Sequence, residues 1–124
     1  MTSKKSDAVR KDSFMTRSEK SGEGVFVRIF EFHAKPGRER EFEKIYGPEG
    51  DWAQLFRRSE AFIRTELHCD RETKGRYVTV DYFASLPEFE KLLAEHRADY
   101  EALDHRCAAV RASEKCIGSF LNRE

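Results

Sequence analysis

The sequence predicts an α+β fold, a ferredoxin-like β-α-β-β-α-β domain with a four-stranded antiparallel sheet and helices on one face. Three observations predict it. Strand-like residues cluster near the start of the folded part, two adjacent strand-like segments follow in the middle, and segments of helical periodicity flank that middle pair. Because the chain has only 124 residues, it can form one core and not two.

The first strand is expected at residues 25–33, which are dense in β-branched and aromatic side chains before Pro36 and Gly37 end the pattern. Strand periodicity divides its side chains between two faces. Phe26, Arg28, Phe30 and Phe32 lie on one face, and Val25, Val27, Ile29 and Glu31 lie on the other. Because helices can cover only one face, a largely apolar second face indicates another covering layer, most simply a second copy in a homodimer. Arg28 and Glu31 are expected to form cross-strand or intersubunit ion pairs.

The first helical region is expected to be broken in two. Its apolar stripe, Phe42, Ile45 and Tyr46, has helical spacing, but residues 47–50 then supply Gly-Pro-Glu-Gly. Asp51 is expected to cap a renewed helix, with Gln54 completing a capping box.

Strands two and three are expected at residues 61–70 and 76–83, joined by the polar loop 71–75 as an antiparallel hairpin. Ser85 and Glu88 then form a capping box that begins the second helical region. That region presents an apolar stripe that includes His96 and bends near residues 95–97. The final strand is expected at Cys116 to Leu121.

Composition excludes several classes of partner. Lys and Arg number 23, as do Asp and Glu, so the net charge is zero and nucleic-acid binding is not expected. No apolar run approaches the length of a membrane span. The three cysteines lack metal or disulfide spacing and are typical of cytosolic thiols, which predicts a cytoplasmic protein. Residues 1–23 are predicted to form a disordered tail, and residues 24–124 the folded domain.

Four segments carry a family resemblance: Phe32-His33-Ala34-Lys35-Pro36-Gly37, Tyr46-Gly47-Pro48-Glu49-Gly50-Asp51-Trp52, Gly75-Arg76-Tyr77 and Tyr100-Glu101-Ala102-Leu103. Together they resemble the antibiotic biosynthesis monooxygenase-like family over residues 24 to 122. The resemblance implies a ferredoxin-like domain that dimerises through its sheets into an α+β barrel. It also implies oxygenase chemistry on polyketide aromatics or quinols, with no metal or flavin cofactor.

Some positions depart from that family. Its haem-degrading branch uses an Asn on the first strand and a Trp and a His on the second helix, whereas here Asn122 and Trp52 are the only residues of their types. Haem degradation is therefore disfavoured. Family members often have Gly at the start of strand two and Trp at the end of strand three, where this chain has Ala61 and Phe83.

Oxygenation without a cofactor requires a base, donors that hold the substrate anion, and an apolar chamber. The candidate bases are Asp81 and His96, and the candidate donor is Tyr100. The candidate pocket residues are Trp52, Tyr77 and Phe83. Each candidate has a structural alternative: an ion pair with a neighbouring Arg for Asp81, a hydrogen-bonded core position for His96, and packing for the aromatic residues. The four histidines are scattered, so a metal site is not expected.

Three other functions remain open from the sequence. The chain can be a structural or regulatory partner protein that uses its charged tail, residues 1–23, as a docking arm. The chain can be a non-catalytic homodimeric sensor or carrier that binds a small hydrophobic or aromatic molecule. It can also be a haem-binding dimer that lacks the degradation triad and uses a His or Tyr as axial ligand.

Overall fold

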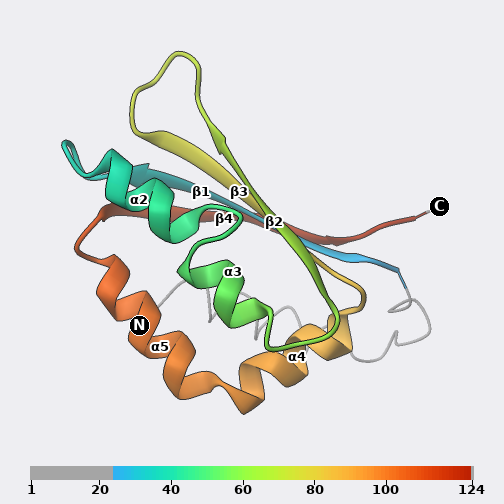
Figure 1. Cartoon of the computed structure of the whole chain (residues 1–124). Coiled ribbons are helices and arrows are strands. Elements are labelled where there is room, and N and C mark those ends of the chain that lie inside the picture. Colours follow the sequence, from blue (N-terminus) through green and yellow to red (C-terminus); the bar gives the residue numbers. More distant parts are fainter. Residues whose placement is uncertain (1–23, 124) are drawn as a thin grey trace.

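The computed structural model describes residues 24–123 and contains one four-stranded antiparallel sheet in the order β2-β3-β1-β4. The strands are β1 (Phe26–Ala34), β2 (Phe62–Cys69), β3 (Arg76–Phe83) and β4 (Arg111–Leu121). The helices are α2 (Glu39–Tyr46), α3 (Asp51–Phe56), α4 (Leu86–Glu95) and α5 (Arg97–Cys107), and they cover one face of the sheet (Figure 1). The predicted ferredoxin-like α+β fold is confirmed. The predicted tail, residues 1–23, lies outside the described residues.

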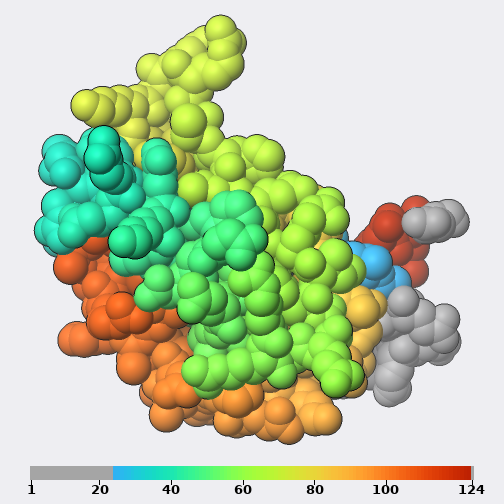
Figure 2. Space-filling view, in the orientation of Figure 1, coloured from blue at the N-terminus to red at the C-terminus, as the bar shows by residue number. Residues whose placement is uncertain are grey.

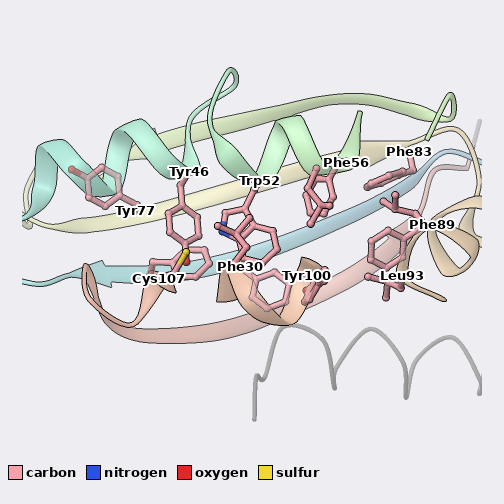
Figure 3. Close-up of a cluster of buried hydrophobic side chains, with 14 of the residues drawn as sticks. Phe30, Tyr46, Trp52, Phe56, Tyr77, Phe83, Phe89, Leu93, Tyr100 and Cys107 are labelled. Atoms are coloured by element: carbon pink, nitrogen blue, oxygen red, sulfur yellow. The ribbon is translucent and has the colours of Figure 1, made fainter. Parts of the chain in front are cut away.

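The core is a layer of aromatic side chains between the sheet and the helices. Residues of β1 are alternately buried and partly exposed, as period two requires, and the buried set faces the helices. Phe30, Trp52 and Tyr100 lie in the middle of this layer, with Tyr77 towards one end and Phe83 towards the other (Figure 3). The rings contact their neighbours at angles that aromatic pairs favour, for example Trp52 edge-on to Tyr100 at 4.9 Å between centroids.

The other face of the sheet is open in the described chain. Val27 of β1 lies opposite Tyr82 of β3 and Phe120 of β4, and each of the three is at least partly exposed. Ile117 and Phe120 are 48% and 49% exposed. The β2–β3 hairpin projects beyond the body of the molecule at its upper edge, while the helical layer beside it is closely filled (Figure 2).

The broken first helix is confirmed, but its predicted cap is wrong. The residue at the N-cap of α3 is Gly50, whose carbonyl accepts from the backbone N–H of Gln54 at 2.9 Å. A side chain at this position would place its Cβ 2.4 Å from the carbonyl oxygen of Ile45, so the tight turn requires glycine. The Asp51 carboxylate does not cap the helix and accepts instead from Arg106 of α5 at 3.2 Å.

The second helical region also divides where the sequence indicates a bend. Ser85 caps α4 by accepting from the N–H of Glu88 at 3.3 Å, which confirms the predicted start. His96 has φ −125° and separates α4 from α5. Strand β4 begins at Arg111, five positions before the predicted Cys116, because its polar first residues still pair with the end of β1. Within residues 24–123 no helix is long and apolar enough to cross a membrane.

Candidate functional site

A buried ion pair lies at the centre of the helix-facing side of the sheet. Arg28 of β1 is directly opposite Asp81 of β3, so strand alternation turns both side chains inward among the aromatic residues. Both are about as buried as the core phenylalanines, at 1% exposure each. The distance from Arg28 Nε to Asp81 Oδ2 is 3.8 Å, which is close enough for charge attraction but too long for a hydrogen bond. This pair confirms the cross-strand ion pair expected for Arg28.

Aromatic rings enclose the guanidinium. Its carbon atom lies 4.7 Å from the ring centre of Phe89, 5.0 Å from that of Phe30 and 5.7 Å from that of Phe56. Such cation–π contacts help to hold a positive charge away from water. Because the rings exclude water, electrostatic interactions inside this space are stronger than at the protein surface.

Hydroxyl groups approach the ion pair from three elements. Thr65 of β2 donates a hydrogen bond to Asp81 Oδ1 at 2.7 Å. Thr79 is also buried and is the neighbour of Asp81 on the inward face of β3. Tyr100 reaches the site from α5 and lies near the Arg28 guanidinium. Arg28, Thr65, Thr79, Asp81 and Tyr100 are called the buried polar cluster below.

The charge of Arg28 and the hydroxyl of Tyr100 affect each other's pKa. Burial lowers the pKa of Arg28, but the proximity of Tyr100 and Asp81 outweighs it, so the pKa rises above its ordinary value. Burial raises the pKa of Tyr100, and the positive charge of Arg28 offsets this only in part. Arg28 therefore stays positively charged and Tyr100 stays protonated at neutral pH.

Much of the hydrogen-bonding capacity of the buried polar cluster is unused within the described chain. None of the three guanidinium nitrogens of Arg28 has a hydrogen-bond partner of acceptable geometry among residues 24–123, and the same holds for Thr79 Oγ1, Asp81 Oδ2 and the Tyr100 hydroxyl. Buried polar atoms usually have partners, because leaving them without one costs free energy. These donors and acceptors converge on one region, which makes it the candidate site of the protein.

Strand β4 borders this region on the far side of β1 from β3. The inward residues of β4 lie opposite those of β1, with Ser119 opposite Arg28 and Cys116 opposite Phe30. These β4 residues are only partly buried, whereas the inward residues of β1 are fully buried.

The predicted site residues do not all meet. Asp81 and Tyr100 both belong to the buried polar cluster, and Trp52 packs against Tyr100. Phe83 is the next inward residue after Asp81 and packs against Phe89, whose ring contacts Arg28.

Tyr77 lies away from the cluster, two inward positions from Asp81 on β3. Its hydroxyl donates to Glu43 Oε2 of α2 at 2.6 Å. Tyr77 and Phe83 lie at opposite ends of the aromatic core (Figure 3). Tyr77 therefore packs at one end of the core, beside Glu43, and does not face the ion pair.

His96 is not where the sequence places it. The helical spacing indicates that it extends the buried stripe of α4, but the helix ends at Glu95 and the backbone turns at His96. Its Nδ1 lies 3.2 Å from Nη1 of Arg58, whose Nη1 also donates to Asp99 at 2.6 Å in an exposed group. His96 therefore lies apart from the buried polar cluster, and its role as a base has no support from the geometry.

Arg28 is the functional candidate that the sequence analysis does not select. The signal is present in the sequence, since Arg28 interrupts the run of Phe26, Phe30 and Phe32 on one face of a strand. A charged residue in that position must either find a partner or lie at a binding site.

Two other features do not combine with this site. A surface groove of about 290 Å³ lies between the segment before β2 and α4 and is lined by Arg58, Ser59, Glu60, Glu88, Lys91, Leu92 and Glu95. Among the described residues, no group of three or more His, Cys, Asp or Glu side chains is arranged to hold a metal ion.

Several solved structures have a fold similar to that of this chain. SnoaB, a cofactor-independent oxygenase from Streptomyces nogalater, is 21% identical and has a TM-score of 0.66, with 82% of this chain and 95% of that chain covered. PA3566 from Pseudomonas aeruginosa is 15% identical with a TM-score of 0.59, over 83% of this chain and 98% of that chain. A NIPSNAP family protein from Agrobacterium tumefaciens is 16% identical with a TM-score of 0.59, over 81% of this chain and 94% of that chain.

A search of curated proteins found no match. The structural similarities, all at low sequence identity, show a shared fold. The family assignment comes from the sequence itself, because the family model described as antibiotic biosynthesis monooxygenase matches residues 25–98, which include β1 to β3 and most of the helical layer. This chain belongs to the antibiotic biosynthesis monooxygenase family.

Proposed function

We propose that the protein is a cofactor-independent monooxygenase that acts on an aromatic, quinol or polyketide-like small molecule. The observation that carries this proposal is the buried polar cluster, in which the carboxylate of Asp81 and the protonated phenol of Tyr100 both lie close to Arg28 among aromatic side chains. Family membership supports the reaction class, and SnoaB is a relative in fold whose oxygenation needs no cofactor.

The reaction balances without an external reductant. A phenol with a hydrogen on the ring carbon para to its hydroxyl reacts with one dioxygen molecule. One oxygen atom becomes a new quinone carbonyl on that carbon, and the other leaves as water with the ring hydrogen and the hydroxyl hydrogen. The phenol is oxidised by four electrons and dioxygen is reduced by four.

Each residue of the cluster has a defined task in this scheme. Asp81 is the general base, because its Oδ2 has no hydrogen-bond partner in the described chain and can accept the phenolic proton. Tyr100 is the donor that holds the resulting phenolate, since its raised pKa keeps the hydroxyl protonated at neutral pH. Trp52 and Phe83 form the apolar wall on which the ring of the substrate stacks.

We also propose that the protein acts as a homodimer in the cytoplasm. The support is the open face of the sheet, where Val27, Tyr82 and Phe120 form a partly exposed apolar surface around the exposed Ile117. A second copy placed against this face would remove that surface from water. The exposed thiol of Cys69 is compatible with a reducing compartment.

A non-catalytic binding protein for a small hydrophobic molecule is the second candidate. One observation favours it: Asp81 already accepts from Thr65 and pairs with Arg28, and His96 is held beside Arg58, so both predicted bases are engaged in structural contacts. A haem-binding dimer remains the third candidate and would give a Soret band when haem is added.

Oxygen uptake separates these functions. The purified protein is incubated with hydroquinones and hydroxylated polyketide-like aromatics in an oxygen electrode, with and without a chelator. We expect uptake that depends on the protein, survives the chelator and is lost in Asp81→Asn. The exposed Asp99→Asn is the matched control and should keep full activity, because its carboxylate pairs with Arg58 at the surface.

Incorporation of one atom from labelled dioxygen into the product would support oxygenation. Ligand binding without oxygen uptake across the panel would favour the sensor or carrier. Equal turnover in Asp81→Asn and the parent protein would remove Asp81 as the base.

A further inference from the structure

We propose that Arg28 is the oxyanion-binding residue of this site, and that it exchanges its partner when a ligand binds. In the free protein its counter-ion is the Asp81 carboxylate. In the complex its counter-ion is the ligand's oxyanion, and Asp81 carries a proton. This inference rests on the proposed function for the location of the site, but it concerns binding and holds whether or not dioxygen reacts.

Arg28 has hydrogen-bond donors available for a ligand. A guanidinium has five N–H donors, and here none of its nitrogens makes a hydrogen bond of acceptable geometry among residues 24–123, although the Tyr100 hydroxyl lies close to it. Among residues 24–123, Asp81 is the one carboxylate within 4 Å of the guanidinium, with its Oδ2 3.8 Å from Nε. The planar array of donors matches a carboxylate or a phenolate, to which hydrogen bonds from an ionised donor are especially strong. An oxyanion that reaches Arg28 can therefore make contacts that Asp81 does not make.

Asp81 is held in place by a hydrogen bond and cannot follow the guanidinium. Its Oδ1 accepts from Thr65 at 2.7 Å, which fixes the carboxylate towards β2. Its Oδ2 faces Arg28 and has no other partner in the described chain. A proton on Oδ2 would leave the hydrogen bond from Thr65 intact, so Asp81 can change its charge without losing its position.

The total charge of the enclosed site limits which ligands can bind there. The titratable groups near Arg28 are Asp81 from β3, Tyr100 from α5 and Cys116 from β4, while Asp104 and Glu114 lie near Tyr100. From α3 and α4 the contacts to Arg28 are the rings of Phe56 and Phe89. Arg28 and Asp81 together are neutral. A ligand that adds a negative charge would leave one buried charge uncompensated, which is costly.

Two classes of ligand satisfy this charge limit in different ways. A phenol or enol enters neutral and gives its proton to Asp81, so the site stays neutral and no proton is exchanged with solvent. A carboxylate enters already ionised, so Asp81 must take one proton from solvent. The site therefore favours acidic hydroxyl compounds over carboxylates, and this preference grows as the pH rises.

Titration calorimetry without oxygen tests this proposal directly. The probes are 2-naphthol and 2-naphthoate, each titrated in phosphate and in Tris, because the two buffers differ in their heat of ionisation and so reveal proton uptake. We expect one proton taken up per 2-naphthoate bound and none per 2-naphthol. In Asp81→Asn we expect no proton uptake with either probe, and binding of 2-naphthoate about tenfold tighter or more, because the carboxylate no longer competes for Arg28.

Controls keep the test independent of folding and of turnover. Asp81→Asn retains an oxygen acceptor for Thr65 and the volume of the side chain, and its circular dichroism is compared with that of the parent protein. Asp99→Asn should keep the full proton uptake. Arg28→Lys should retain weakened binding of 2-naphthoate, and Arg28→Met should lose it.

Several results would overturn the proposal: no proton uptake with 2-naphthoate in the parent protein, unchanged uptake in Asp81→Asn, unchanged binding in a folded Arg28→Met protein, or no binding of either probe at millimolar concentration. Failure of oxygen uptake alone would refute the oxygenase and leave this binding result standing.

Discussion

Replacing Arg28 with methionine removes the positive charge at the centre of the core and leaves Asp81 buried without a counter-ion. The two charged groups are 3.8 Å apart. At an effective dielectric constant of about 20 their attraction is ~4 kcal/mol. Breaking a buried ion pair by removing one partner typically costs about 3–5 kcal/mol. Methionine keeps the length of the side chain and its contacts with the surrounding rings, so the loss in unfolding free energy should come from the charge.

Urea unfolding followed by circular dichroism at neutral pH measures this loss. A decrease of about 3–5 kcal/mol would be a large fraction of the 5–15 kcal/mol that is typical of a domain. The double variant Arg28→Met/Asp81→Asn should recover most of it, because neither charge then remains and Thr65 keeps an acceptor. Arg64→Met, which removes an exposed guanidinium stacked on Tyr82, is the control and should change stability little. The reasoning would be refuted by a single variant within about 1 kcal/mol of the parent, or by a double variant no more stable than the single.

Three further predictions concern the hairpin and the open face. A hydrogen bond from the backbone N–H of Glu72, followed in size by one from the Arg76 guanidinium, lowers the pKa of Asp70 to about 2. The ionised carboxylate therefore stabilises the hairpin at any pH above the ordinary pKa of an Asp. This stabilisation is lost as the pH falls towards 2. The protection of residues 71–75 against hydrogen exchange, relative to the intrinsic exchange rate at each pH, should fall over that range, and Asp70→Asn should remove the change. Gly75 has φ 84°, so Gly75→Ala should lower the unfolding free energy by about 1 kcal/mol in a urea titration. Phe120→Asp should convert the proposed dimer to a monomer in light scattering, and a mass equal to that of the parent would contradict the role of this face.

The order of the elements could be predicted because it depends on local signals. Gly and Pro mark the ends of β1 and α2, and Ser85 marks the start of α4 by a capping hydrogen bond that the structure confirms. Strand β4 was predicted too short, since its first residues are polar and their place in the sheet depends on pairing with β1, which a local pattern does not show. The cap at Asp51 failed because the chain approaches itself too closely at Gly50 for any side chain.

The site could be predicted only in part, for a related reason. Period two correctly turns Asp81 inward, and helical spacing correctly turns Tyr100 inward. Helical spacing is less informative for His96, because α4 ends one residue earlier and its imidazole lies 3.2 Å from the guanidinium of the exposed Arg58. The pairing of Arg28 with Asp81 depends on β1 lying beside β3 in the sheet, a contact between residues far apart in the sequence.

A second guanidinium, that of the partly buried Arg111, borders the core, and the contrast between the two supports a functional role for Arg28. Arg111 donates to Asp104 at 3.1 Å and to the Tyr46 hydroxyl at 3.2 Å, so it joins α5, β4 and α2 through hydrogen bonds. Those contacts are sufficient to explain its presence as structural. Arg28 joins its partner Asp81 by charge alone and makes no hydrogen bond of acceptable geometry in the described chain, although Tyr100 lies close to it. Apolar side chains of similar size could replace such a pair with little loss of stability. The contribution of Arg28 to this protein is therefore to be sought in what it binds.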